Sequence, residues 1–276
     1  MLVTGASTGI GRKVTERLAA GGYFVYAGAR KDPGLEALGK IKNVQAVRLD
    51  VTKQDDIDAA ATTIEKAGRG LYGLINNAGV GTQGSLADSR DDEFELTMRV
   101  NAFGPWRVTK AFAPLIVAEK GRIATTSSVS GVLAGANLTS YAMSKHAVEA
   151  FTDSLAAEMA PLGVHVSVVE PGFYKTEIVK NAVKRLGRQY AHLNDSLSRF
   201  EEPDDVAAAF ALALSDPKPK RRYLVVPIED QARRTIQKQI AQLVELNEGH
   251  PFTYDRETLI KMLDEALAWS RPRPSE

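Results

Sequence analysis

Short apolar runs alternate along the chain with longer amphipathic stretches. The apolar runs are rich in Val, Ile and Tyr, carry few charges, and occupy residues 23–27, 44–49, 71–76, 122–126, 164–169 and 223–226. Such runs are typical of strands that are buried on both faces. The stretches between them place apolar residues at helical spacing over residues 10–20, 57–67, 94–118 and 141–160. The alternation predicts a doubly wound α/β fold, in which one parallel sheet of about seven strands has helices on both faces.

The pattern changes near residue 228. Residues 229–270 are helical in pattern and charged, and Gly249, His250 and Pro251 interrupt them. We expect a helical C-terminal extension here, with Asp255 capping its second helix. Neither a low-complexity linker nor an internal repeat divides the sequence, so we predict one domain over residues 1–228, with residues 229–270 as an extension of it. Residues 271–276 are expected to be disordered.

The charge balance narrows the expected partners. The chain has 35 basic and 34 acidic residues and a formal net charge of +1, which gives no strong field for nucleic acid or an anionic membrane. One basic cluster is interpreted as a solvated loop before a strand; it contains Lys218, Lys220, Arg221 and Arg222. The sequence has no Cys, no apolar run as long as a membrane span, and no targeting segment before its first strand. We therefore expect a cytoplasmic protein.

A glycine-rich turn follows the first strand and opens the first helix. Glycine lets the backbone turn sharply and approach a pyrophosphate closely, and the helix N-terminus offers free N–H groups to phosphate. A glycine turn without a ligand is the alternative, but the position of this turn at the start of an alternating fold favours a Rossmann-type dinucleotide site. The residues of the turn that are expected to contact the cofactor are Gly5, Ser7, Thr8, Gly9, Ile10 and Gly11.

The end of the second predicted strand indicates which dinucleotide is bound. Enzymes that use NAD(H) usually place an acidic residue about 20 residues past the glycines. Here Ala29 occupies that position and Arg30 follows it. A guanidinium can bind a 2′-phosphate with two hydrogen bonds, whereas a carboxylate would repel it. A surface arginine at a strand end is the alternative interpretation. We favour NADP(H) as the cofactor, with Lys31 assisting Arg30.

Tyr141 and Lys145 are candidates for acid–base chemistry. Their four-residue spacing puts both on one helix face, and a nearby ammonium can lower the pKa of a phenol. The pair alone is weak evidence, because roughly half a match is expected by chance in a chain of this length. Ser128 strengthens it, because it follows a strand at the edge where parallel sheets bind ligands. Ser127 and Ser130 are alternatives for the same hydroxyl.

Together these motifs resemble the short-chain dehydrogenase/reductase family, in its compact subfamily, over residues 1 to about 226. Four further segments match in the family's order. These are the Asp-Val pair at 50–51, the Asn-Asn-Ala-Gly motif at 76–79, the helix asparagine Asn101 and the Pro-Gly-x-x-x-Thr loop at 171–176. The resemblance adds to the expected cofactor site Asp50, Val51, Asn77, Ala78, Gly79, Val100, Pro171, Gly172 and Thr176, together with Tyr141 and Lys145.

The resemblance also assigns roles. By this resemblance Tyr141 is the acid–base residue. Lys145 binds the nicotinamide ribose and lowers the pKa of Tyr141. Ser128 positions the substrate oxygen, and Asn101 holds a water that links Lys145 to solvent. The helical pattern around Asn101 is soon interrupted by the Gly-Pro pair at residues 104–105, and a broken helix frees a carbonyl for that water.

The resemblance implies an NADP(H)-dependent oxidoreductase that transfers a hydride between nicotinamide and a carbonyl or alcohol carbon. Residues 130–137, residues 173–200 and the C-terminal helices are expected to line the substrate pocket. Apolar residues are frequent there, including Phe173, Tyr190 and Leu193, so we expect a hydrophobic ketone, aldehyde or alcohol, steroid- or retinoid-like by subfamily analogy. No histidine spacing predicts a metal site.

Assembly and two other functions complete the expectations. In the family, the helices corresponding to residues 94–118 and 141–160 pair across a two-fold axis, which implies a homodimer or homotetramer. A non-catalytic dinucleotide-binding regulator is one alternative function, but it would be expected to lose Ser128, Tyr141 or Lys145. A sugar-nucleotide epimerase is the other; it shares the tyrosine–lysine pair but usually has a different glycine spacing and a larger C-terminal domain.

Overall fold

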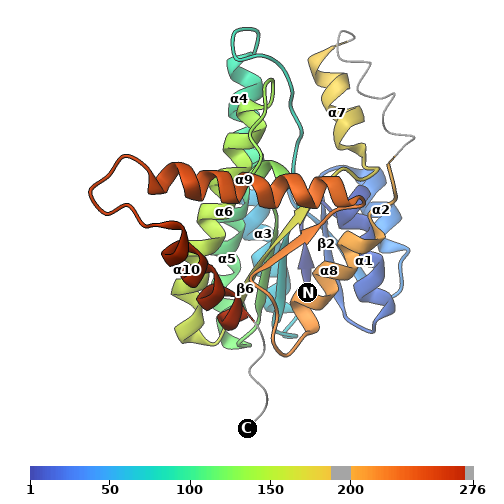
Figure 1. Ribbon diagram of the computed structural model, residues 1–276. Coiled ribbons are helices and arrows are strands. Elements are labelled where there is room, and N and C mark those ends of the chain that lie inside the picture. The colour runs from blue at the N-terminus through green and yellow to red at the C-terminus, as the bar shows by residue number, and fades with distance from the viewer. Residues whose placement is uncertain (188–199, 271–276) are drawn as a thin grey trace. The chain divides into compact units, whose positions relative to one another are not determined.

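The computed structural model describes residues 1–187 and 200–270 (Figure 1). Within them, seven parallel strands form one sheet in the order β3-β2-β1-β4-β5-β6-β7. The predicted doubly wound parallel sheet is confirmed. The strands are β1 (Leu2–Val3), β2 (Val25–Ala29), β3 (Val44–Arg48), β4 (Gly73–Asn76), β5 (Arg122–Thr126), β6 (His165–Pro171) and β7 (Arg222–Val225).

Strand limits differ from the prediction where a turn uses apolar residues. The strand expected at residues 23–27 lies at Val25–Ala29 instead. Tyr23 belongs to the preceding turn, because its N–H donates to the Leu18 carbonyl at 3.1 Å. An apolar run therefore located the strand, but not the residue at which pairing with β1 and β3 begins.

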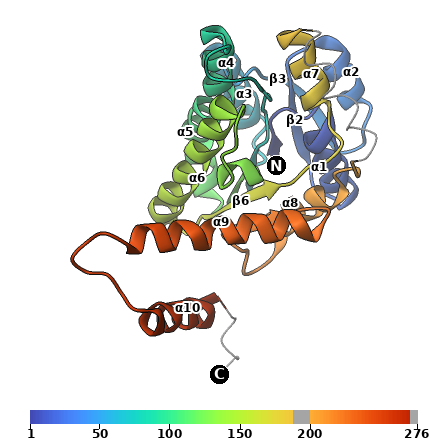
Figure 2. The ribbon, with the colours of Figure 1, turned by 45° about the horizontal axis from the view of Figure 1, so that its top comes forward.

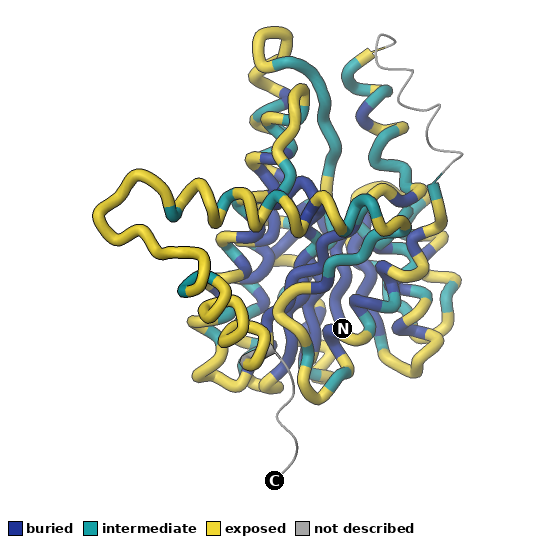
Figure 3. The backbone as a smooth tube through the Cα atoms, in the orientation of Figure 1, coloured by how far each residue is buried: buried dark blue, intermediate teal, exposed yellow. Residues whose placement is uncertain are grey.

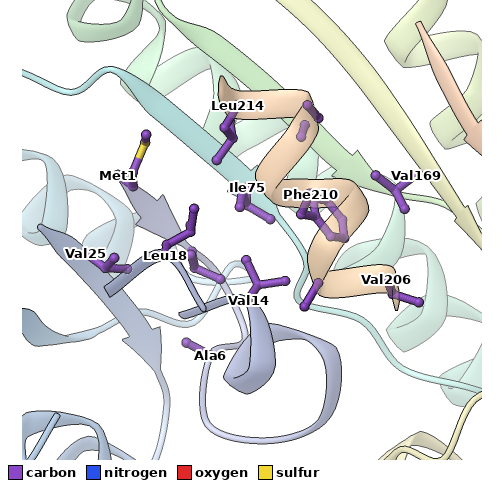
Figure 4. Packing of buried hydrophobic residues seen from close by; sticks show 14 of the residues in the cluster. Met1, Ala6, Val14, Leu18, Val25, Ile75, Val169, Val206, Phe210 and Leu214 are labelled. Carbon is purple, nitrogen blue, oxygen red and sulfur yellow. The ribbon is translucent and has the colours of Figure 1, made fainter. Parts of the chain in front are cut away.

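Helices cover both faces of the sheet (Figures 1 and 2). On one face lie α1 (Gly9–Ala20), α2 (Asp32–Gly39) and α8 (Asp204–Ser215), and on the other α3 (Gln54–Lys66), α5 (Phe103–Ala118) and α6 (Thr139–Met159). Each face has its own apolar cluster, and burial is concentrated on the strands between them (Figure 3). Val14, Leu18 and Phe210 belong to the first cluster (Figure 4), and Phe112 and Leu155 to the second.

The helix predicted over residues 94–118 is two helices. One is α4 (Asp91–Asn101) and the other is α5, and Ala102 lies between them with φ −105° and ψ −57°. The expected break is present, but it comes before the Gly-Pro pair rather than at it. Pro105 lies in the first turn of α5, where its missing N–H costs nothing. A continuous helix would need that N–H for the carbonyl of Asn101, so the chain breaks one turn upstream.

The C-terminal region contains α9 (Glu229–Asn247) and α10 (Arg256–Ser270). The chain divides into two compact units, Met1–Ala232 and Arg233–Glu276, so the boundary falls inside α9. The Thr258 N–H donates to the Asp255 Oδ1 at 2.9 Å, which confirms the predicted cap of the second helix. Membership of residues 229–270 in the same domain stays a prediction, and the expected disorder of residues 271–276 lies outside the described residues. No helix in the described part of the chain is long and apolar enough to cross a membrane.

Candidate active site

The glycine turn has the tight backbone that its sequence predicts. Gly5 and Gly9 have φ of +64° and +54°, the left-handed region that favours glycine. A Cβ on Gly5 would lie 2.8 Å from the Ala78 Cα, and one on Gly11 would lie 2.4 Å from the Asn77 Nδ2. The helix α1 begins at Gly9, with extended backbone at Thr8 and no capping side chain among the described residues. The first N–H groups of α1 therefore remain available for an anion.

Thr4 and Asn77 join three strand ends at this turn. The Thr4 Oγ1 accepts the N–H groups of Asn77 and Ala78 at 2.9 and 3.0 Å. The Asn77 amide donates to the carbonyls of Thr4 and Gly5 at 3.0 and 3.3 Å and accepts the Thr126 hydroxyl at 3.3 Å. The ends of β1, β4 and β5 are thus fixed relative to one another, at the point where the strand order reverses and ligands bind in such sheets.

Asn76 has a different role. Its amide donates to the Thr109 hydroxyl at 2.9 Å and to the Thr125 hydroxyl at 3.5 Å. These bonds tie β4 to α5 and to β5 inside the core. Asn76 therefore steadies the sheet, whereas Asn77 shapes its ligand-binding edge.

Residues Ala29 and Arg30 end β2 beside the glycine turn. Ala29 is buried, and a Cβ on Gly34 would lie 2.9 Å from the Ser7 Cβ, so the start of α2 approaches the turn closely. The Arg30 side chain is 56% exposed, and its Nη1 lies 3.9 Å from the Asp50 Oδ2. Asp50 is held by the Thr52 N–H and hydroxyl at 2.9 and 2.7 Å. The Arg30 guanidinium therefore lies at this edge of the sheet, but its long contact with Asp50 does not fix its position.

The remaining residues of the expected cofactor site lie along the same edge. Val51 and Val100 are buried, and a Cβ on Gly104 would lie 2.8 Å from the Val51 Cγ2. Gly79 lies near Asn101, because a Cβ on Gly79 would be 3.5 Å from the Asn101 Oδ1.

Asn101 holds the loop after β4 onto α6. Its amide oxygen accepts the Val80 N–H at 2.8 Å, and its nitrogen donates to the Val80 carbonyl at 2.9 Å. The same nitrogen donates to the Ser144 hydroxyl at 3.0 Å, which itself donates to the Tyr141 carbonyl at 2.7 Å. Asn101 is 1% exposed. Its side chain is therefore committed to protein contacts, so a water can be held only by its backbone carbonyl.

Tyr141, Lys145 and Ser128 come together as the sequence predicts. Both α6 residues lie on one helix face, with the Lys145 Nζ 5.7 Å from the centre of the Tyr141 ring. The Lys145 ammonium donates to the Thr126 carbonyl at 2.9 Å. Of the three candidate serines, Ser128 is the one whose hydroxyl is close enough to the Tyr141 phenol to lower its pKa. Its hydroxyl also accepts the Ser130 N–H at 3.1 Å, which fixes the short helix η1 (Val129–Gly131).

Burial controls the ionisation of the two α6 residues. Burial raises the pKa of the Tyr141 phenol, and the hydrogen bond with Ser128 acts in the opposite direction. Burial lowers the pKa of Lys145 to about 8, against the negative charge of Glu149. The lowered tyrosine pKa expected from the sequence is thus not produced by the chain alone. The phenol is held in its protonated form, which suits a proton donor.

The loop after β6 closes over the glycine turn. The Gly172 N–H donates to the Val225 carbonyl at 2.8 Å, and the Phe173 N–H donates to the Gln231 Oε1 at 3.0 Å. A Cβ on Gly172 would lie 2.1 Å from that same oxygen, so a larger residue there would displace the Gln231 side chain. Thr176 precedes α7 (Glu177–Leu186), and its Cβ lies 3.3 Å from the point a Cβ on Gly9 would occupy. The predicted loop therefore meets the predicted turn.

An ion pair joins α7 to α4, and both helices rise from the carboxyl edge of the sheet (Figures 1 and 2). The Arg185 Nε lies 3.2 Å from both carboxylate oxygens of the buried Glu93. Another Arg185 nitrogen donates to the Gly81 carbonyl at 2.6 Å. Neither residue has a motif around it, so the sequence offered no signal for this contact.

A hollow lined by the loop after β4, the start of α4 and residues 137–140 corresponds only in part to the expected substrate pocket. Among its lining residues, Asn137 and Leu186 belong to the predicted segments, whereas Asp88, Arg90 and Glu93 do not. The described lining is therefore more polar than expected. Tyr190 and Leu193, which were expected in the pocket, lie outside the described residues.

Two buried carboxylates and one arginine were missed by the sequence interpretation. Lys218, Lys220 and Arg221 are exposed and precede β7, in agreement with the predicted solvated loop. Arg222 is also exposed, but it begins β7 and contacts Glu149 and Glu170, which the charge run did not reveal. The spacing of Glu149, one helical turn past Lys145, is a signal that could have found it. Within the described chain, no group of three or more His, Cys, Asp or Glu side chains can hold a metal ion.

Comparison with known proteins identifies relatives across this region. A family model described as short chain dehydrogenase matches residues 1–187. The mitochondrial D-beta-hydroxybutyrate dehydrogenase of Bos taurus is 39% identical over 182 residues, which are 62% of this chain and 53% of the relative. Retinol dehydrogenase 5 of Mus musculus is 38% identical over 183 residues, 64% of this chain and 57% of the relative. The chain thus spans about half the length of these curated relatives.

Solved structures share the fold over most of the chain. A short-chain dehydrogenase from Streptomyces avermitilis has a TM-score of 0.76 and 28% identity, covering 90% of this chain and 94% of its own. An actinorhodin polyketide ketoreductase with NADPH has a TM-score of 0.72 and 25% identity, covering 81% and 94%. A 3-ketoacyl-(acyl-carrier-protein) reductase from Brucella melitensis, complexed with NADH, has 0.72 and 28%, covering 81% and 94%.

Proposed function

Because the chain belongs to the short-chain dehydrogenase/reductase family, we propose that it is an oxidoreductase that uses NADP(H) to interconvert a carbonyl group and an alcohol. The observation that carries the proposal is the convergence of Tyr141, Lys145 and Ser128 beside the glycine turn. A glycine turn with no room for side chains, at a helix N-terminus, fits a dinucleotide pyrophosphate. The nicotinamide, when bound, gives or accepts the hydride.

The residues of the chain divide the proton chemistry between them. In carbonyl reduction, Tyr141 donates its phenolic proton to the substrate oxygen, and Ser128 hydrogen-bonds that oxygen. Lys145 holds positive charge beside the phenolate that remains, which favours the transfer. In alcohol oxidation the proton moves in the reverse direction.

Proton resupply is proposed to pass by the Asn101 carbonyl. In an unbroken helix this carbonyl would accept the N–H of residue 105, but Pro105 has none. The carbonyl can therefore accept a hydrogen bond from a water, while the Asn101 side chain holds Val80 and Ser144.

The preference for NADP(H) is proposed from the charges at the end of β2. Ala29 presents no carboxylate, and Arg30 supplies a planar cation suited to a 2′-phosphate. Relatives in this fold are seen with either cofactor, so the family alone leaves the choice open. The preference therefore rests on Arg30, assisted by Lys31.

Substrate and assembly follow the same reasoning. Apolar residues in the segments after β5 and β6 favour a hydrophobic ketone, aldehyde or alcohol as substrate, and relatives named for retinol and hydroxybutyrate are consistent with that range.

Trp106 and Phe103 on α5 are about half exposed, which supports a homodimer or homotetramer built on α5 and α6.

An absorbance assay tests the proposal. The purified chain is mixed with NADPH or NADH and a panel of ketones and aldehydes, and loss of the reduced nicotinamide is followed. We expect turnover with at least one hydrophobic carbonyl, and strongly reduced turnover with the Tyr141→Phe variant. Binding of cofactor without turnover of any carbonyl or alcohol would instead favour a regulator. Conversion of a nucleotide sugar with no net change in the nicotinamide would favour an epimerase.

A further inference from the structure

A row of charged residues runs along one face of α6 from the site to the surface. Lys145, Glu149 and Asp153 follow one another at four-residue spacing, which places them on one side of the helix. Lys145 is 5% exposed and Glu149 is 8% exposed, whereas the Asp153 side chain is 55% exposed. The acid next to Lys145 is therefore buried, and the acid one turn further is solvated.

The two oxygens of the Glu149 carboxylate have different surroundings. Its Oε2 accepts a hydrogen bond from the Arg222 guanidinium. Its Oε1 is buried and has no hydrogen-bond partner among the described residues. A Cβ on Gly131 would lie 2.9 Å from this Oε1 and 2.7 Å from the Ser127 Oγ. The unpartnered oxygen thus lies against the segment between Thr126, which binds Lys145, and η1.

A second buried acid shares the same arginine. The Glu170 Oε1 on β6 accepts from the Arg222 Nη1 at 3.0 Å, and Glu170 is 5% exposed. Burial and the charge of Glu149 raise the pKa of Glu170 to about 7, against the effect of Arg222. Two carboxylates that share one cation cannot both stay ionised easily. Glu170 therefore takes up a proton near neutral pH, and Arg222 supplies the cation that both side chains contact.

Few other charges face Lys145. On α6 they are Tyr141 and Glu149; η1 carries no titratable side chain; and β5 contributes the Thr126 carbonyl. The charged residues of α4 are exposed, except Glu93, which pairs with Arg185. Around Glu149 the charged groups are Glu170 from β6, Arg222 from β7, and Asp153, which pairs with Arg221 and Arg222.

We infer that Glu149, held by Arg222, is a positioning residue for Lys145, whose carboxylate keeps the buried ammonium charged for the reaction at Tyr141; this rests on the proposed function. A buried ammonium without a nearby negative charge readily loses its proton. The pKa of Lys145 is already lowered to about 8 with Glu149 present. Loss of the Glu149 charge would bring deprotonation of Lys145 into the neutral range.

A thermal unfolding series against pH tests the inference without cofactor. The folded-state pKa of Lys145 lies below its unfolded value, so stability rises with pH between the folded and the unfolded pKa and is lower below that window. Glu149→Gln should lower the folded pKa further, so the rise in Tm begins about 1 pH unit lower than in the wild type. The matched control Asp153→Asn, which removes the same charge one turn away, should leave the onset unchanged.

Two further variants distinguish the inferred positioning role of Glu149 from a purely structural role. In a Lys145→Met background, Glu149→Gln should no longer change the pH at which Tm rises. A purely structural Glu149 would instead lower Tm by the same amount at every pH and in both backgrounds, and that result would overturn the inference. Glu149→Asp, which keeps the charge, should show the wild-type onset, and an onset as low as that of Glu149→Gln would overturn the inference. If Glu149→Gln does not fold, Glu149→Ala replaces it, with the same early onset expected.

The pH profile of activity gives the second readout. For carbonyl reduction, the alkaline limb of kcat/KM should move about 1 pH unit lower in Glu149→Gln, with rates at pH 6 near those of the wild type. Asp153→Asn should not move the limb. An active wild type with an unmoved limb in Glu149→Gln refutes the inference alone. A wild type that turns over no carbonyl refutes the proposed function, while the unfolding series still reports on the Lys145–Glu149 pair.

Discussion

The two ends of the candidate site are built differently. At the nucleotide end, Arg30 is more than half exposed and lies 3.9 Å from its acidic neighbour Asp50. At the chemical end, Lys145 is 5% exposed and donates to a strand-end carbonyl at 2.9 Å. The first end relies on solvated charge at a strand tip, and the second on buried groups held by three elements.

The difference indicates how readily single substitutions can alter the function of each end. An exposed charge is screened by water and salt, and its replacement leaves the packing intact. A buried ammonium is coupled to every group that compensates it. Cofactor preference should therefore vary with single surface substitutions, whereas the acid–base chemistry should depend on a set of residues that change together.

The largest effect is expected at Tyr141. Tyr141→Phe removes the hydroxyl that exchanges the proton and little else, so kcat should fall by about 10²- to 10⁴-fold. NADPH affinity, measured by fluorescence titration, should stay close to that of the wild type. A variant with near-normal kcat would show that another group supplies the proton.

An intermediate effect is expected where α7 joins α4 between the two ends. Arg185→Met leaves the buried Glu93 with the longer, 3.7 Å contact to Arg90 and should lower the free energy of unfolding by about 1–3 kcal/mol. Urea denaturation measures this. Lys184→Met, an exposed neighbour on the same helix, is the matched control and should have little effect. Equal stabilities of the two variants would contradict the structural importance of the pair.

The smallest effect is expected at Arg30. A charge-assisted contact with a 2′-phosphate at an exposed position is worth about tenfold in the preference for NADPH over NADH. Arg30→Ala should remove most of that preference, and Ala29→Asp should reduce or reverse it. The measurement is kcat/KM for both cofactors. An Arg30→Ala enzyme with unchanged preference would assign cofactor selection to other residues.

Local sequence patterns were sufficient for the sheet and for the central chemical groups. Buried parallel strands require apolar runs, so β5 was predicted at its observed limits. The glycines were predictable because their φ values and close contacts exclude side chains. Tyr141, Lys145 and Ser128 were brought together by helical spacing and by the common edge at which parallel strands end.

What the sequence could not provide were contacts between distant elements. Glu93 and Arg185 lie 92 residues apart, and Glu149 and Arg222 lie 73 apart; no local pattern encodes such pairs. The break at Ala102 was misplaced because the apolar spacing continues from α4 into α5, while the cause, Pro105, acts one turn upstream. The exposed basic cluster before β7 was predicted, but the contacts of Arg222 with two buried carboxylates were not, because they depend on the pairing of β7 with β6.

The position of β7 has a consequence for how the molecule folds. Arg222 reaches Glu149 and Glu170 only when β7 pairs with β6, and this pairing joins segments that are distant along the chain. Before that pairing, Glu149 and Glu170 become buried without a cation beside them. Docking of β7 brings Arg222 to both carboxylates and relieves the repulsion between them in the same step. During refolding, helical signal should therefore recover before activity does, and the delay should lengthen as the pH rises above neutrality.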